Sequence, residues 1–259
     1  MGSLAASRAV LYKRRLLENH TVMDTSGISH HIHSRYNADL EGVRSGVLQM
    51  GGMVEEQITR AMESLISGNM ELIDKVIGED HRVNAIEVEL DEACSHIIAR
   101  RQPAAGDLRL LVAVIKTITD LERIGDEAQK IARMAKLIHT ADRQHMPRLD
   151  LSHVADRATA MLRQSLDAFA RLDVSEAMRV VKQDQAVDDE FRAIMRQLIT
   201  FMMEDPRTIT RSLEILFIAK AVERIGDHAK NMAEYVVYMV KGRDVRHTRI
   251  EDVERELLE

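Results

Sequence analysis

The chain has 259 residues, a length that can bury a substantial core in one or two domains. Charged residues make up 30% of the sequence, and 15 methionines accompany only four phenylalanines, four tyrosines and no tryptophan. This composition is typical of long amphipathic helices packed through aliphatic side chains, so we expect an all-α fold. The net charge of −6 and the lack of interleaved basic and aromatic residues argue against nucleic acid as a partner.

Cys94 is the single cysteine, so the chain cannot form an intramolecular disulfide. The sequence also lacks a secretory signal and any apolar run of the roughly 18 to 20 residues that cross a bilayer. We therefore expect a cytoplasmic protein, with any membrane association peripheral and made through partners.

The N-terminal residues 1–22 differ in character from the rest of the chain, and Met23 is an alternative start. We interpret residues 1–29 as an extension outside the fold, disordered or not native to the protein. The histidines at positions 30, 31 and 33 could bind a transition metal, but a flexible polar terminus is the simpler interpretation.

Three prolines, Pro103, Pro147 and Pro206, separate long segments of helical periodicity, where residues that cannot continue a helix belong. The pattern predicts six long helices, over 35–66, 70–101, 107–140, 150–171, 175–203 and 208–241. Asp107 is the expected cap of the third helix, and Asp173 with Glu176 forms a capping-box pattern before the fifth.

The two halves of the chain repeat each other. An offset of 101 residues (122 to 223) aligns ERIGD at 122–126 with ERIGD at 223–227. An offset of 104 residues (76 to 180) aligns Val76, Asp80 and Val83 with Val180, Asp184 and Val187. This internal duplication predicts two tandem, pseudo-symmetric three-helix bundles, over 30–141 and 142–242, followed by a charged tail over 243–259.

Each half places a glutamate and an aspartate four residues apart within or beside the apolar stripe of its third helix, where their like charges repel. A hard cation held between helices would relieve this repulsion, because clustered carboxylates are its usual ligands. The arginines of the two motifs, Arg123 and Arg224, point about 100° away and are expected to pair with another helix or face a partner. One such motif usually marks a solvated or salt-bridged face, but its duplication beside the core makes us favour metal binding over a structural network of arginines and carboxylates. The mid-helix glycines Gly125 and Gly226 suggest that backbone or ligand approaches closely there.

The repeated ERIGD, the three-helix repeat and the sequence PAAGDLR at 103–109 together resemble the PhoU family over about residues 30–242. The resemblance implies a cytoplasmic, non-enzymatic negative regulator of phosphate uptake and of the phosphate-starvation response. It implies a homodimer that associates with the sensor histidine kinase and with the ATPase subunit of the phosphate ABC transporter. It also implies bound metal ions (iron, manganese, magnesium or zinc) on acidic motifs of the helices.

Carried onto this chain, the resemblance assigns metal ligands in both halves. They are Asp80, Asn84, Glu122 and Asp126 in the first half, and Asp184, Asp188, Glu223 and Asp227 in the second. The sequence departs from the pattern at Asn84, where a neutral amide replaces an acid and makes the first site the weaker one.

Two other functions stay open at this point. The same carboxylates could serve a metal-dependent phosphohydrolase, although no separate nucleophile, general base or glycine-rich phosphate loop accompanies them. A plain helical scaffold with structural ion pairs would bind no metal.

Overall fold

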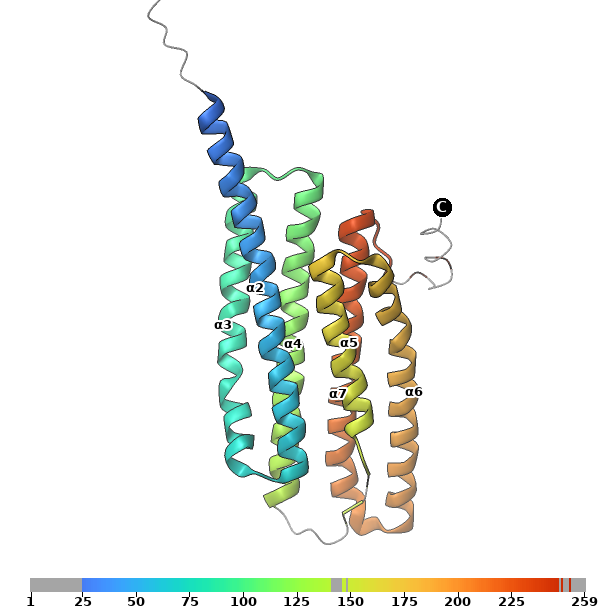
Figure 1. Cartoon of the computed structure of the whole chain (residues 1–259). Helices are drawn as coiled ribbons and strands as arrows, with labels where there is room; N and C mark the ends of the chain where they lie inside the picture. The colour runs from blue at the N-terminus through green and yellow to red at the C-terminus, as the bar shows by residue number, and fades with distance from the viewer. Residues whose placement is uncertain (1–24, 141–145, 148, 247, 249–251, 253–259) are drawn as a thin grey trace, which may run out of the picture. The chain divides into compact units, whose positions relative to one another are not determined.

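The computed structural model describes residues 25–140, 146–147, 149–246, 248 and 252; the side chains of residues 25–34 and of Asp80 lie outside this description. The described part contains six long α-helices, one 3-10 turn and no strand (Figure 1). The helices are α2 (Thr25–Ser67), α3 (Met70–Arg101), α4 (Ala105–Thr140), α5 (Ser152–Arg171), α6 (Val174–Glu204) and α7 (Ile209–Lys241), with the 3-10 turn η1 (Pro206–Thr208) before α7. The chain divides into two units, residues 1–39 and 40–259.

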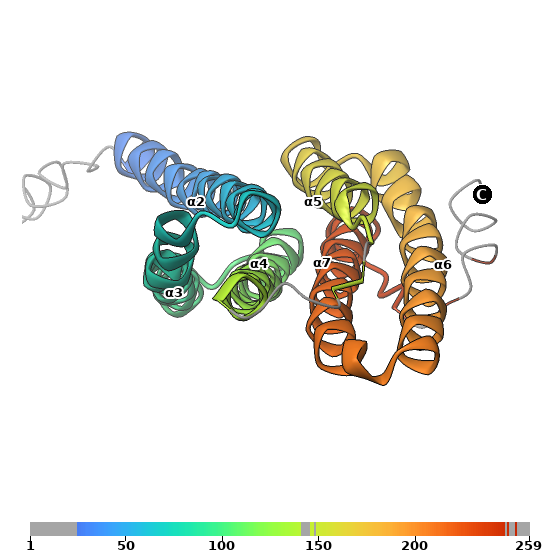
Figure 2. The ribbon, with the colours of Figure 1, turned by 90° about the horizontal axis from the view of Figure 1, so that it is seen from below.

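The helices form two groups of three. Figure 2 shows α2, α3 and α4 in one group and α5, α6 and α7 in the other, with α4 beside α7. In the first group, Arg60 of α2 donates to Glu79 of α3 at 2.9 Å, and a ring nitrogen of His139 of α4 lies 2.7 Å from the carbonyl oxygen of Leu65. In the second group, α7 packs on both α5 and α6. The predicted tandem three-helix bundles are confirmed.

Helix ends follow local capping chemistry. Asn69 begins α3 by accepting from the backbone N–H groups of residues 71 and 72, and Asp173 begins α6 by accepting from that of Glu176 at 3.0 Å. Asp107 does not cap α4: the helix begins two residues earlier, and Asp107 lies in the first turn, where its charge still favours the helix dipole. Similarly, α2 begins at Thr25 rather than at 35, and the segment between them contains no proline that would interrupt the helix.

Apolar residues at helical spacing form the cores. In α3 the five residues Val76, Val83, Leu90, Cys94 and Ile97 follow one face and are all buried. Burial, followed by the nearby Asp91 carboxylate, raises the pKa of the Cys94 thiol to about 11, so this cysteine is a packing residue at neutral pH. The core of the second bundle includes Phe169, a fully buried side chain.

The two bundles meet through α4 against α7 and through α2 against α5. Arg163 of α5 forms an ion pair with Glu55 of α2, and Arg44 donates to the carbonyl oxygen of Ala170 at 3.0 Å. Gly51 lets the helices α2 and α5 approach closely, since an added Cβ would lie 2.5 Å from a Leu166 methyl carbon. None of the described helices combines the length and apolarity needed to cross a bilayer.

Candidate metal centre

Three carboxylates from two helices of the second bundle converge. Asp184 and Asp188 lie four residues apart on α6, so they share one face, and Asp227 of α7 lies against them. One carboxylate oxygen from each of the three lies within 4.8 Å of the others. The antiparallel packing of α6 on α7 therefore brings together acids that are far apart in the sequence.

Glu223, the first residue of the second ERIGD, lies one turn from Asp227 and is 9% exposed. Three basic side chains surround the group. The ammonium of Lys220 pairs with Glu223, that of Lys230 lies 2.6 Å from a carboxylate oxygen of Asp184, and a guanidinium nitrogen of Arg192 lies 3.6 Å from one of Asp188. Asp227 forms no ion pair with any of the described basic residues, although it is close to the other three acids.

The positive charges of Lys220, Lys230 and Arg192 neutralise the four carboxylates only in part. Burial raises the pKa of Asp227 to about 6, and the negative charges of Glu223, Asp184 and Asp188 add to the effect. The pKa of Asp188 is also raised, by burial and then by Asp184 and Glu223. Carboxylates that resist ionisation beside one another are stabilised by a bound cation, because it replaces the missing positive charge.

The donor set suits a hard metal ion. Mg²⁺, Ca²⁺, Mn²⁺ and iron all accept carboxylate oxygens, and three oxygens on two helices leave room for water in the remaining positions. The partial exposure of Asp188 and Asp227 gives an ion access from solvent.

The first bundle is built differently. Asp126 is exposed, contrary to its expected position beside the core, while Glu122 is half-buried and the side chain of Asp80 lies outside the described residues. Asn84 is half-buried, and its buried amide oxygen has no hydrogen-bond partner among the described residues. No group of three acids comparable to that of the second bundle occurs among the described side chains here.

The two motif arginines also differ in their contacts. Arg224 reaches across to α4, where a guanidinium nitrogen lies 2.8 Å from a carboxylate oxygen of Glu127. Arg123 stays on its own helix and lies 4.0 Å from Asp120. Arg224 therefore joins the two bundles, whereas Arg123 remains largely in solvent.

Sequence reasoning missed a buried polar network between α4 and α7. Asp120, 2% exposed, lies 2.7 Å from Nδ1 of His228, and Asn231 donates to the same oxygen at 3.5 Å. Glu127 is buried nearby and also accepts from Lys130 at 3.2 Å. A usable signal existed, because the offset of 101 residues aligns Glu127 with His228 on equivalent faces of the two repeats. These polar groups lie at the bundle interface and not beside the three carboxylates.

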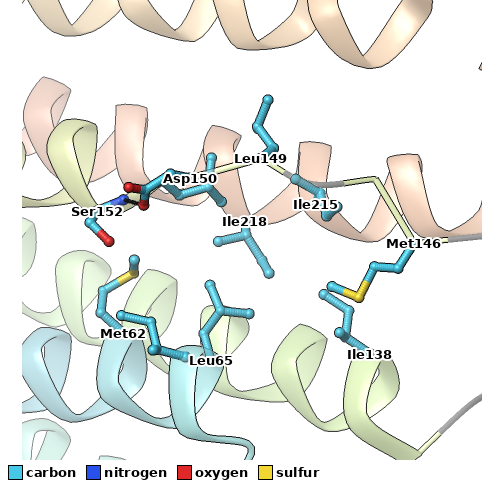
Figure 3. A pocket seen from close by; sticks show the side chains of 11 residues that line it. Met62, Leu65, Ile138, Met146, Leu149, Asp150, Ser152, Ile215 and Ile218 are labelled. Carbon is cyan, nitrogen blue, oxygen red and sulfur yellow. Dashed lines mark hydrogen bonds between the residues drawn. The ribbon is translucent and has the colours of Figure 1, made fainter. Parts of the chain in front are cut away.

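Gly226 does not mark a close approach of backbone. A Cβ added there would meet Val187 at 3.4 Å and Met161 at 3.8 Å, both ordinary contacts with side chains. A cavity of about 150 Å³ lies elsewhere, between the ends of α2, α4 and α7 (Figure 3). Its lining is mainly aliphatic, with Met62, Ile138 and Ile218 pointing toward the space, so it carries no recognisable chemistry.

The sequence of the chain is similar to one family of known proteins over most of its length. A family model described as "PhoU domain" matches residues 47–135 and again 151–236. The chain is 47% identical over 237 residues to the Serratia marcescens phosphate-specific transport system accessory protein PhoU, covering 91% of this chain and 97% of that protein. It is 45% identical over 234 residues to the protein of the same name from Escherichia coli K12, covering 90% and 96%.

Two solved structures of PhoU proteins superpose on this chain. The crystal structure of PhoU from Pseudomonas aeruginosa is 45% identical and superposes with a TM-score of 0.77 over 80% of this chain and all of that one. The Streptococcus pneumoniae phosphate transport system regulatory protein PhoU, 25% identical, superposes with a TM-score of 0.75 over 81% of this chain and 99% of that one.

Proposed function

The chain belongs to the PhoU family, and from that membership we propose that it is an accessory regulator of phosphate transport. The observation that carries the proposal is the identity of 45 to 47% with the named transport accessory proteins over about nine tenths of the chain. We assign it no catalytic role, because the acidic group is surrounded by lysine, arginine and aliphatic side chains and not by a nucleophile with its base.

In finer terms, we propose a cytoplasmic negative regulator that links the phosphate ABC transporter, through its ATPase subunit, to the sensor histidine kinase of the phosphate-starvation response. Two long three-helix bundles offer extended helical surfaces for more than one partner, including a second copy of the chain. A deletion strain grown in abundant phosphate is expected to express phosphate-starvation genes. Normal repression in that strain would contradict the regulatory role.

We further propose that Asp184, Asp188, Glu223 and Asp227 bind a metal ion. The convergence of three carboxylates and the raised pKa of Asp227 support this assignment. The equivalent residues Asp80, Asn84, Glu122 and Asp126 would form a weaker site, since the amide replaces one negative charge. The ion is iron, manganese, magnesium or zinc, and elemental analysis would identify it.

The repeat supplies a matched control for metal binding. Protein purified without chelators or an affinity tag is compared with two double variants, Glu223→Gln with Asp227→Asn and Glu122→Gln with Asp126→Asn. We expect bound metal in the parent, loss in the first variant and retention of most of it in the second. Absence of metal from all three would assign the carboxylates to ion pairing. Turnover of phosphate esters that disappears with Asp227→Asn would instead favour a phosphohydrolase.

A further inference from the structure

The outer side of the α6–α7 hairpin exposes a row of large apolar side chains. They are Ile199 and Met203 on α6, and Ile209, Leu213 and Phe217 on α7, each between 40% and 80% exposed. Successive members on each helix are four residues apart, so each set follows one helical face. Soluble proteins rarely expose neighbouring large apolar groups without a binding role.

The register of the hairpin places the two sets next to each other. The ammonium of Lys230 lies 2.6 Å from Asp184, and that of Lys220 lies 5.4 Å from the centre of the Phe191 ring. Continuing this antiparallel register toward η1 puts Ile199 opposite Leu213 and Met203 opposite Ile209. The five residues therefore form one continuous strip, which we call the hairpin strip.

The duplication shows that the fold does not require this strip. At the equivalent positions of the first repeat the chain has Ser95, Ala99, Leu108, Val112 and Lys116. Three of these five are small or polar, although α3 and α4 pack on each other as α6 and α7 do. The continuous row of large apolar side chains is thus specific to the second repeat.

One unpaired cation adjoins the strip. Arg192 and Arg196 continue the α6 face toward the metal centre and Lys220 continues the α7 face, but Arg192 is paired with Asp188 and Asp189, and Lys220 is paired with Glu223. Arg196 is exposed and has no ion pair among the described residues, so its charge is available to a partner. Acidic groups next to an apolar surface would complement this arrangement.

The shape of the strip suits a linear occupant. Its five side chains form two short rows along α6 and α7 and present on the order of 400 to 600 Å², taking roughly 150 to 250 Å² for a fully exposed large side chain. One amphipathic helix laid along the hairpin matches this elongated surface.

We propose that the hairpin strip binds an amphipathic helix of a partner protein, with acidic residues of that helix placed against Arg196. This inference rests on the proposed adaptor function and adds the surface and the chemistry of the docked segment. The apolar side of the helix packs along the strip from Phe217 to Met203, and its acidic end lies over Arg196.

Synthetic peptides of about 18 residues, long enough for five helical turns, test the proposal by fluorescence anisotropy with the full chain. One peptide has leucines at helical spacing and glutamates at one end, a second has lysines in place of the glutamates, and a third is a scrambled version of the first. We expect the acidic amphipathic peptide to bind and the other two to bind at least about tenfold more weakly.

Matched variants locate the site. Leu213→Glu and the control Leu108→Glu replace side chains that are both 40% exposed, one in the strip and one in the first repeat. We expect a loss of about tenfold or more in affinity for the first and no change for the second. Arg196→Glu should weaken the acidic peptide and strengthen the basic one. Circular dichroism and thermal unfolding verify that each variant is folded.

Equal binding of the acidic and scrambled peptides, or equal loss from the Leu108→Glu control, would overturn the proposal. So would sedimentation showing that Leu213→Glu converts a dimer to a monomer while no peptide binds, because the strip would then belong to a second copy. These results are separable from the regulatory role: a deletion strain with normal repression contradicts that role whatever the peptides do. If the deletion strain is derepressed and Leu213→Glu fully restores repression, the hairpin strip is not the docking surface.

Discussion

Asp227→Asn should stabilise the metal-free protein. The Asp227 carboxylate is partly buried beside Asp184, Asp188 and Glu223, and this environment raises its pKa from 3.8 to about 6. Near pH 7.5 the native state must therefore hold an ionised group that it disfavours. An asparagine has nearly the same shape without the charge, so the substitution removes the penalty. The same substitution should weaken metal binding.

The magnitude follows from the pKa shift. A rise of about two units corresponds to about 3 kcal/mol, since one unit equals about 1.4 kcal/mol. Because the carboxylate is only half-buried and solvent screens its charge, we expect about 1 to 2 kcal/mol of added stability. For a chain of this size that gain raises Tm by roughly 2 to 8 °C.

The pH dependence has a definite sign. A carboxylate whose folded-state pKa is raised binds its proton more tightly in the native state than in the unfolded state, so its favourable contribution is present below about pH 4 and lost as pH rises through about 6. The advantage of Asp227→Asn should therefore be largest near pH 7.5 and fade by about pH 4.

Urea unfolding in EDTA at several pH values measures this prediction, with Asp126→Asn as the control. Asp126 is the equivalent residue of the first ERIGD and is exposed, so its substitution should change the unfolding free energy by less than about 0.5 kcal/mol. Adding a divalent metal should reduce or reverse the advantage of Asp227→Asn, because the parent gains binding energy. Destabilisation by Asp227→Asn in EDTA at pH 7.5 would refute the reasoning.

Two further comparisons test the packing between helices. Arg224→Ala should cost about 0.5 to 1.5 kcal/mol, because it removes one partner of the buried Glu127, which keeps its pair with Lys130. Arg123→Ala should cost under about 0.5 kcal/mol, and urea unfolding that gives the reverse order would contradict the ion-pair assignment. Gly51→Ala should destabilise the fold by about 1 to 3 kcal/mol, because the added methyl overpacks the contact between α2 and α5. Gly226→Ala makes only ordinary contacts and should stabilise the fold by up to about 1 kcal/mol, because alanine favours a helix more than glycine does. Thermal unfolding in EDTA measures both variants, and a lower Tm with Gly226→Ala would mean that its surroundings are tighter than the contacts indicate.

Local chemistry made much of this fold predictable. Prolines between helices, the cap at Asp173, and apolar spacing along each helix depend on residues within one or two turns. The repeat offset then predicted two similar bundles. The early start of α2 at Thr25 and the start of α4 at Ala105, before Asp107, escaped, because the exact end of a helix is the part that local sequence patterns determine least well.

The acidic motifs show the limit of such reasoning. Both copies of ERIGD are identical, so helical periodicity assigned them the same position beside the core. Their surroundings differ: Glu223 is buried and Asp227 meets two aspartates of α6, whereas Asp126 of the first copy is exposed. The buried pair of Asp120 and His228 was likewise invisible, because its two members are 108 residues apart.

The sequence by itself determined the six helices, their stripes and their duplication, since these follow from neighbouring residues and from similarity between the halves. Only the tertiary structure decided which copy of ERIGD gathers a group of carboxylates and which arginine joins the bundles. Charge interactions act between side chains brought together from different helices, and identical segments therefore acquire different roles when the helices beside them differ.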